Sequence, residues 1–153
     1  MDHIDKKILE ELQKNSSLPL SELSKRVGLT NTPCWNRIKK LEEEKIIKSK
    51  SIIIDNKKIN LPITVFLSIS IQNHTEVWLK NFVKVVNKYD QIIEVHRLTG
   101  SNSDYQITIL SQSIEKYDKF QQLLIKEIEC TNMTSHISLQ TIKKNNKYPL
   151  NFI

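Results

Sequence analysis

One short turn between two helical patterns constrains this chain more than any other sequence feature. Gly28 is one of only two glycines among the 153 residues, and Leu29 and Thr30 follow it. A chain so sparing of glycine is expected to keep it where the backbone needs a positive φ or a close approach. Apolar residues recur at helical spacing on both sides of this turn. Two helices joined by a three-residue turn that contains glycine indicate a helix-turn-helix.

The pattern predicts three short helices over the first 44 residues. Asp2 or Asp5 can cap the first helix, the second begins after Pro19, and the third runs from about Asn31 to Glu44. Each helix has one apolar face, which we expect to form the core of this region. These faces consist of Ile4, Ile8 and Leu12 in the first helix, Leu20, Leu23 and Val27 in the second, and Cys34, Ile38 and Leu41 in the third.

The opposite face of the third helix carries the residue types that read DNA. Asn and Thr side chains can hydrogen-bond to base edges in the major groove, and Lys neutralises phosphate. The N-terminus of this helix, with Thr30 as its expected cap, can also donate backbone N–H groups to phosphate. Residues 25–50 contain eight basic side chains against three acidic ones. The predicted DNA-binding residues are Thr30, Asn31, Thr32, Trp35, Asn36, Lys39, Lys40, Lys48 and Lys50.

Several of these residues also have purely structural interpretations. A lysine-bearing helix face can simply be solvated, and Trp35 can belong partly to the core. Arg37 can pair with the acidic residues 42–44 instead of a phosphate. Cys34 is expected to be a small buried residue, because no histidine or acid is placed to activate its thiol. The preceding turn and the basic residues 48–50 favour the nucleic-acid interpretation.

Two isoleucine runs, at residues 46–47 and 52–54, flank this basic segment. We interpret them as a short hairpin or wing, followed by a linker strand through residues 55–60. The remaining residues predict strands at 62–72, 91–99, 104–111 and 133–142, and helices at 75–89 and 113–128. The order βαββαβ is that of the ferredoxin-like fold, with both helices on one face of an antiparallel sheet.

The predicted fold is therefore α+β, with three parts. Residues 1–50 form a winged helix-turn-helix domain, 51–60 a linker strand, and 61–153 a ferredoxin-like dimerisation and effector domain. Because two helices cover only one face of the sheet, we expect the other face to pair with a second copy, forming a homodimer.

Composition limits the remaining classes. Two cysteines lie 96 positions apart, which predicts neither a disulfide framework nor a Cys-rich zinc site and favours a reducing cytoplasm. No apolar run approaches the roughly 18–20 residues of a membrane span. The first five residues are too charged for a signal peptide. His3, His74 and His136 lack metal-ligand spacing, so no metal site is expected.

Nearly the whole chain resembles the Lrp/AsnC family (leucine-responsive/asparagine-responsive, or feast/famine) of transcriptional regulators. The similarity in the first half includes the first helix and the helix-turn-helix signature, at residues 4–13, 23–30, 32–34 and 37–42. In the second half it is carried by Glu94-Val95-His96, Thr99-Gly100, Asp104-Tyr105, Lys143 and Pro149-Leu150.

This resemblance implies a regulatory domain that forms dimers, often assembled into octamers. Family members usually sense amino acids in clefts between dimers, near the loop after the second regulatory strand. An amino acid needs acceptors for its ammonium, such as Asp104, and donors for its carboxylate. The alternative is a tight polar turn whose Asp and Asn satisfy their own backbone. By position, the implied effector-binding residues are Gly100, Ser101, Asn102, Asp104, Tyr105 and Ser135.

Three positions depart from the family pattern. The loop has one extra residue, with Ser101-Asn102 where an acid is usual. Lys45 stands where the family usually has glycine after the recognition helix, so we expect that C-cap to be made differently. Ile128-Glu129 replaces the usual Pro-Gly before the last strand.

The leading hypothesis is a sequence-specific, DNA-binding transcriptional regulator that is not an enzyme. We expect it to be cytoplasmic and nucleoid-associated, without a cofactor, and modulated by an amino acid. An alternative is a siroheme-decarboxylase-like enzyme, which would need histidines lining a tetrapyrrole cavity. His96 alone lies near the corresponding strands, and a packing or hydrogen-bonding role is favoured for it. A third possibility is a regulatory subunit whose DNA-binding half is vestigial.

Overall fold

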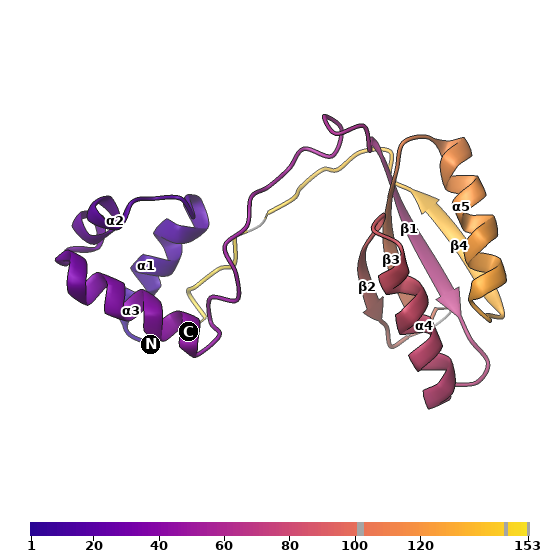
Figure 1. Ribbon diagram of the computed structural model, residues 1–153, viewed down its shortest axis with the longest axis horizontal. Coiled ribbons are helices and arrows are strands. Elements are labelled where there is room, and N and C mark those ends of the chain that lie inside the picture. Colours follow the sequence, from indigo (N-terminus) through magenta and orange to yellow (C-terminus); the bar gives the residue numbers. More distant parts are fainter. Residues whose placement is uncertain (101–102, 146, 153) are drawn as a thin grey trace. The chain divides into compact units, whose positions relative to one another are not determined.

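The computed structural model describes residues 1–100, 103–145 and 147–152, and its contacts divide the chain into two compact units (Figure 1). The N-terminal unit comprises Met1–Ile53 together with Ile142–Ile153, and the sheet unit comprises Ile54–Thr141. The sequence pattern assigns all of residues 61–153 to one domain. The C-terminal segment instead joins the N-terminal unit, where Leu150 packs against the helical core.

Three helices build the N-terminal unit: α1 (His3–Lys14), α2 (Leu20–Val27) and α3 (Asn31–Glu43). Asp2 caps α1, because its carboxylate accepts the N–H groups of Ile4 and Asp5 while the Asp5 carboxylate accepts the N–H of Asp2. The three predicted apolar faces meet in one core. Its buried members are Ile8, Leu9, Leu23, Val27, Cys34, Ile38 and Leu41.

Lys45 ends α3 in a left-handed conformation, with φ of 56°. Its N–H donates to the carbonyl of Glu42, and the N–H of Ile46 donates to the carbonyl of Leu41, at 3.0 and 2.9 Å. These two bonds form the Schellman motif in which glycine normally takes the left-handed position. The C-cap was expected to be made differently without glycine. The structure corrects this, because the backbone keeps the glycine-type geometry with lysine in it.

The hairpin predicted around the basic segment is not formed, since residues 46–62 contain no strand. Ile52 and Ile53 are 80% and 74% exposed, and no strand among the described residues pairs with them. The expected linker strand over 55–60 is instead a turn, closed by hydrogen bonds between Asn56 and Leu61. High β-propensity alone does not form a hairpin, because an isolated two-stranded ribbon is marginally stable in water.

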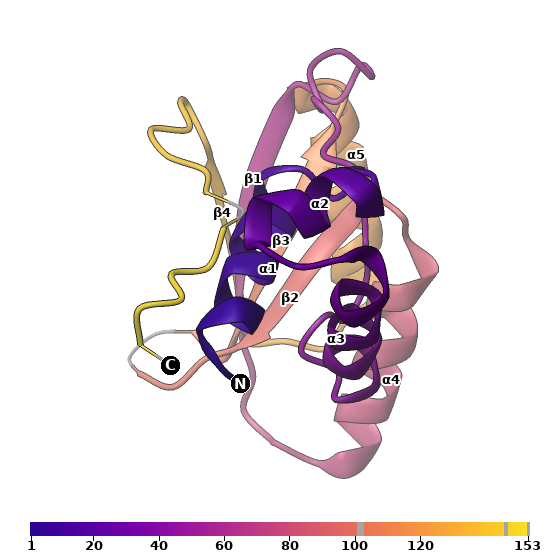
Figure 2. The same ribbon diagram turned by 90° about the vertical axis from the view of Figure 1, so that its left-hand side faces the viewer.

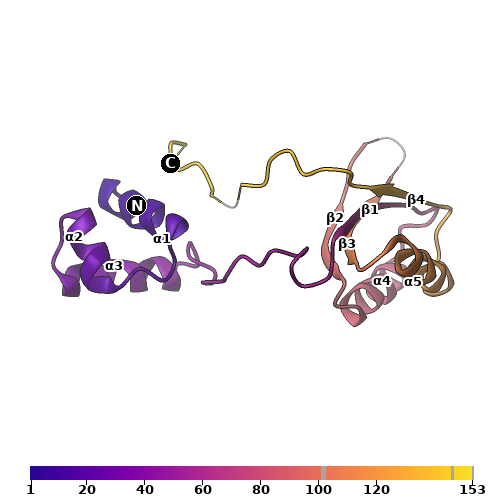
Figure 3. The same cartoon turned by 90° about the horizontal axis from the view of Figure 1, so that it is seen from above.

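The sheet unit has the predicted βαββαβ order. Its elements are β1 (Ile63–Ser70), α4 (Glu76–Lys88), β2 (Ile92–Arg97), β3 (Tyr105–Ser111), α5 (Ile114–Glu127) and β4 (Asn132–Ile137). The strands lie in the order β2-β3-β1-β4 and all neighbours are antiparallel. Both helices cover the same face, as Figure 3 shows. This arrangement confirms the ferredoxin-like prediction.

The two faces of the sheet differ in chemistry. Val65, Leu67 and Ile69 of β1 are fully buried against the helices. On the other face, Phe66 is paired with Thr108 and His136 in the neighbouring strands. That face is largely polar, and its pairing with a second copy stays a prediction.

In the described part of the chain, every helix is too short or too polar to cross a membrane.

Candidate nucleic-acid interface

Figure 2 shows the ribbon of helices α2 and α3. The turn between them is fixed by backbone geometry and by one buried hydroxyl. Gly28 has φ of 74°, the left-handed conformation expected for it, and the N–H of Leu29 donates to the carbonyl of Ser24 at 2.8 Å. The Ser24 hydroxyl, which is buried, donates to Oδ1 of Asn31 at 2.7 Å. The turn is therefore tied to the first residue of α3, and this sets where α3 points.

The predicted reading face of α3 is exposed. Cys34, Ile38 and Leu41 are buried, as the spacing predicted. All nine predicted DNA-binding residues are exposed: Thr30, Asn31, Thr32, Trp35, Asn36, Lys39, Lys40, Lys48 and Lys50. Thr30 occupies the N-cap position, but its side chain makes no capping hydrogen bond. Asn31 uses its carbonyl oxygen inside the protein, which leaves its amide group as the available donor.

The lysines of α3 are held loosely. The Nζ atoms of Lys39 and Lys40 lie 3.8 Å from carboxylate oxygens of Glu43 and Glu44, one turn further along the helix. Lys39 also lies over the Trp35 ring, 5.3 Å from its centroid. Exposed pairs of this kind contribute little to stability. A phosphate can therefore replace either glutamate at small cost.

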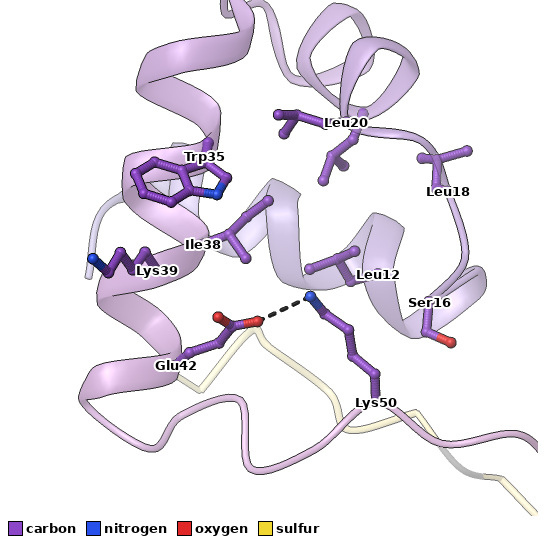
Figure 4. A pocket seen from close by; sticks show the side chains of 10 residues that line it. Leu12, Ser16, Leu18, Leu20, Trp35, Ile38, Lys39, Glu42 and Lys50 are labelled. Carbon is purple, nitrogen blue, oxygen red and sulfur yellow. Dashed lines mark hydrogen bonds and ion pairs between the residues drawn. The ribbon is translucent and has the colours of Figure 1, made fainter.

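Trp35 and Lys39 also line a pocket of about 340 Å³ on one flank of α3 (Figure 4). Half of the Trp35 surface is exposed, and the helical core is formed by other residues. Lys50 reaches the pocket from the segment after α3, where its Nζ lies 2.9 Å from Oε1 of Glu42. The floor is apolar and contains Leu12, Leu18, Leu20, Leu23 and Ile38. The structure thus brings three predicted DNA-binding residues, Trp35, Lys39 and Lys50, to one rim.

Arg37 has a structural partner in α1. Its guanidinium lies 2.7 Å from carboxylate oxygens of both Asp2 and Asp5. These ion pairs raise the pKa of Arg37, with Asp5 the larger cause. The pKa of Asp2 falls to about 2, first because its carboxylate accepts the Asp5 backbone N–H and second because of Arg37. The sequence offers residues 42–44 as the alternative partner. The carboxylates at the start of α1 take that role and tie α1 to α3.

Of the implied effector residues, the structure describes Gly100, Asp104, Tyr105 and Ser135. Gly100 has φ of 140°, and Ser101 and Asn102 lie outside the described residues. The Asp104 carboxylate accepts the backbone N–H of Ile71 at 2.8 Å and lies 3.4 Å from Nε2 of His74. Part of its hydrogen-bonding capacity therefore fixes the end of β1.

Two further implied effector residues contact side chains of the helices in the sheet unit, Tyr105 as a buried residue and Ser135 as a half-buried one. Tyr105 is only 5% exposed, and its ring packs against Trp78 and Phe82 with centroids 5.3 and 4.8 Å away. The Ser135 hydroxyl is hydrogen-bonded to the hydroxyl of Tyr117, in α5. Burial raises the pKa of Tyr117. These partners could not be read from the sequence, since they depend on which face of the sheet each residue occupies.

The histidines do not gather into a metal site, and no group of three potential ligands occurs in the described part of the chain. His96 is exposed on β2, with its Nε2 atom 2.9 Å from Oε1 of Glu94. The packing or hydrogen-bonding role favoured for His96 from the sequence stays a prediction.

Comparison with known proteins finds a matching family for each unit. Residues 1–48 match a family described as winged helix-turn-helix DNA-binding, and residues 64–148 match the Lrp/AsnC ligand binding domain. The regulator Zrp of Zymomonas mobilis is 38% identical over 153 residues, covering 100% of this chain and 99% of that protein. The transcriptional activator DecR of Escherichia coli is 33% identical over 98% of this chain and 99% of its own length.

Solved structures agree with these relatives. An AsnC family transcriptional regulator from Agrobacterium tumefaciens is 37% identical, covers 100% of this chain and 99% of its own, and superposes with a TM-score of 0.94. The regulator NMB0573 from Neisseria meningitidis, in complex with L-Met, has a TM-score of 0.93 at 29% identity, covering 99% of this chain and 98% of its own. A helix-turn-helix joined to a ligand-binding domain defines a DNA-binding transcriptional regulator. The chain belongs to the Lrp/AsnC family of such regulators.

Proposed function

We propose that this regulator reads a specific DNA sequence with α3, as a homodimer. The observation that carries this proposal is the exposed polar face of α3, which presents Thr32, Asn36, Lys39 and Lys40 while its apolar face is buried. In this proposal Asn36 contacts base edges in the major groove, and the two lysines contact phosphates. Two copies of α3 would enter successive major grooves, about 34–36 Å apart or a multiple of that distance.

Salt dependence of binding tests the lysines. The double variant Lys39→Gln/Lys40→Gln is expected to weaken binding on all sequences, and to reduce the slope of log K against log salt by about 0.9 for each phosphate that is no longer neutralised. The matched control is Lys84→Gln/Lys119→Gln, which removes the same charge from exposed positions of the sheet unit and should leave the slope unchanged. Equal slopes for the parent and the α3 variant would refute this docking.

Sequence preference tests Asn36 separately. Asn36→Ala removes a side chain that can pair with adenine, so it should reduce discrimination between preferred and altered sites by about 1–3 kcal/mol. The preferred sites come from selection of bound fragments of the source genome. An unchanged preference would assign base reading to other residues.

We further propose that an amino acid or related small molecule modulates DNA binding by changing how dimers assemble, up to an octamer. The family of the sheet unit is described as ligand-binding, and one structural neighbour is a complex with L-Met, which supports this proposal. A ligand that favours one assembly shifts the population towards the operator affinity of that assembly. Binding to chromosomal DNA would place the protein in the nucleoid.

Within the proposed effector site, the loop from Gly100 to Tyr105 contributes Asp104 as the acceptor for the ligand's ammonium group. Asp104→Asn removes the negative charge but keeps an oxygen that can accept the N–H of Ile71. DNA binding without effector should then be unchanged, while its response to a panel of amino acids is lost. A full response in this variant would exclude Asp104 as the acceptor.

A further inference from the structure

The segment from Ile142 onwards belongs to the N-terminal unit, where it contacts α1. The sheet ends with β4 at Ile137, and Tyr148 then lies against α1. Gln13, near the last turn of α1, provides the contact. Its amide nitrogen donates to the carbonyl of Tyr148 at 3.3 Å, and its amide oxygen accepts the N–H of Tyr148.

This pair of hydrogen bonds recognises a peptide backbone. One carboxamide satisfies both the N–H and the C=O of a single residue, as a neighbouring β-strand would. The Tyr148 side chain takes no part, because it is 81% exposed. Many residues could therefore stand at this position, provided that the backbone is extended.

Leu150 provides the apolar anchor. It packs against the core that Ile8, Leu23 and Ile38 help to form. Pro149 lies between the backbone contact and this anchor. Its ring fixes φ near −65° and it has no N–H to satisfy, so less conformational entropy is lost when the segment docks. The docked motif is thus a residue whose backbone N–H and C=O both bond to Gln13, followed two positions later by leucine.

The contact is small enough to open. The hydrogen bonds from Gln13 and the partly buried Leu150 carry the docking, while Tyr148 and Phe152 are both 81% exposed. Segments with few buried contacts open at low free energy. At its other end, α1 is tied to α3 by the ion pairs of Arg37. Helix α1 is therefore held at both ends, by α3 and by the C-terminal segment.

We propose that residues 147–150 form a detachable clamp. The surface of α1 around Gln13 is a docking site for a short extended peptide, its occupant is this chain's own C-terminal segment, and release of the clamp loosens α1. Residues 138–146 connect β4 to the clamp along the chain. Any interaction that holds these residues away from α1 would therefore compete with docking of the clamp. This proposal is independent of what α3 binds.

Hydrogen exchange of the α1 amides tests the clamp in the full chain. Gln13→Ala and Leu150→Ser should each speed exchange about tenfold, because each removes interactions that are typically worth about 1 kcal/mol or more. Tyr148→Ala and Phe152→Ser are the matched controls from the same segment, since both side chains are exposed, and they should change nothing. Unchanged exchange in both Gln13→Ala and Leu150→Ser would overturn the proposal.

A second measurement tests whether the site accepts a peptide. A fluorescently labelled peptide of residues 143–153 should bind the Leu150→Ser chain, and bind the parent at least about tenfold more weakly because the parent's own segment acts at high effective concentration. If Leu150→Ser does not fold, Leu150→Ala replaces it, because it removes the same apolar anchor without adding a polar group. Absence of binding to the emptied site refutes a docking surface. Exchange rates that depend on protein concentration would assign the occupant to a second copy and refute the intrachain clamp.

Discussion

Replacing Lys45 with glycine should stabilise the N-terminal unit. Lys45 has φ of 56°, and a left-handed conformation costs a residue with a β-carbon about 1–2 kcal/mol. Glycine avoids that cost, but it makes the unfolded chain more flexible, and this lowers the free energy of unfolding by about 0.4–1 kcal/mol. Both hydrogen bonds of the Schellman motif are already formed with lysine. The expected net gain is therefore about 0.5–1 kcal/mol in the free energy of unfolding.

Urea unfolding followed by tryptophan fluorescence measures this gain. Trp35 and Trp78 are the two tryptophans, so a Trp78→Phe background leaves Trp35 to report on the N-terminal unit alone. For a small unit with a urea dependence of about 1 kcal/mol/M, the midpoint should rise by about 0.5–1 M.

Lys45→Ala is the matched control, because it removes the same charge and keeps a β-carbon in the left-handed position. It should leave the midpoint close to that of the parent. If Lys45→Ala raises the midpoint as much as Lys45→Gly does, the gain comes from the removed charge, and the argument from backbone conformation is wrong.

Two further predictions concern acid and the core of the sheet unit. The pKa of Asp2 is about 2 in the folded chain and 3.8 ordinarily, so its contribution to stability is complete above about pH 4 and is lost as the pH falls towards 2. Asp2→Asn should remove that component from the pH dependence of urea unfolding, and an unchanged acid profile would argue against it. Leu124 is fully buried, so Leu124→Ala should lower the free energy of unfolding by about 2–5 kcal/mol. Leu123→Ala, at a 40% exposed neighbour, should cost less than about 1 kcal/mol by the same denaturation, and equal losses would contradict the assigned core.

The buried face of α3 could be predicted, because the spacing of its apolar residues is a local property of the sequence. Cys34, Ile38 and Leu41 fall on one side of any helix drawn through them, and that side must be buried when an adjacent helix has a matching face. The sheet unit could be predicted for a related reason, since alternation in β1 and helical spacing in α5 each specify one buried face.

Other features depend on partners that local patterns do not identify. Residues 52–54 have strong β-propensity, yet a strand needs a neighbour, and the described part of the chain supplies none there. The sequence offers residues 42–44 as partners for Arg37, but the carboxylates of Asp2 and Asp5, far away in the sequence, form its ion pairs. Gln13 and Tyr148 are 135 positions apart. Their residue types do not predict a hydrogen bond between the Gln13 side chain and the Tyr148 backbone.

The split composition of the N-terminal unit has a consequence during protein synthesis. Helices α1 to α3 leave the ribosome before the sheet unit, whereas Leu150, which packs against their core, is made only after it. The nascent helices must therefore wait, with part of their apolar surface uncovered, while the whole sheet unit is translated. At about 5–20 residues per second, the hundred or so intervening residues take roughly 5–20 seconds.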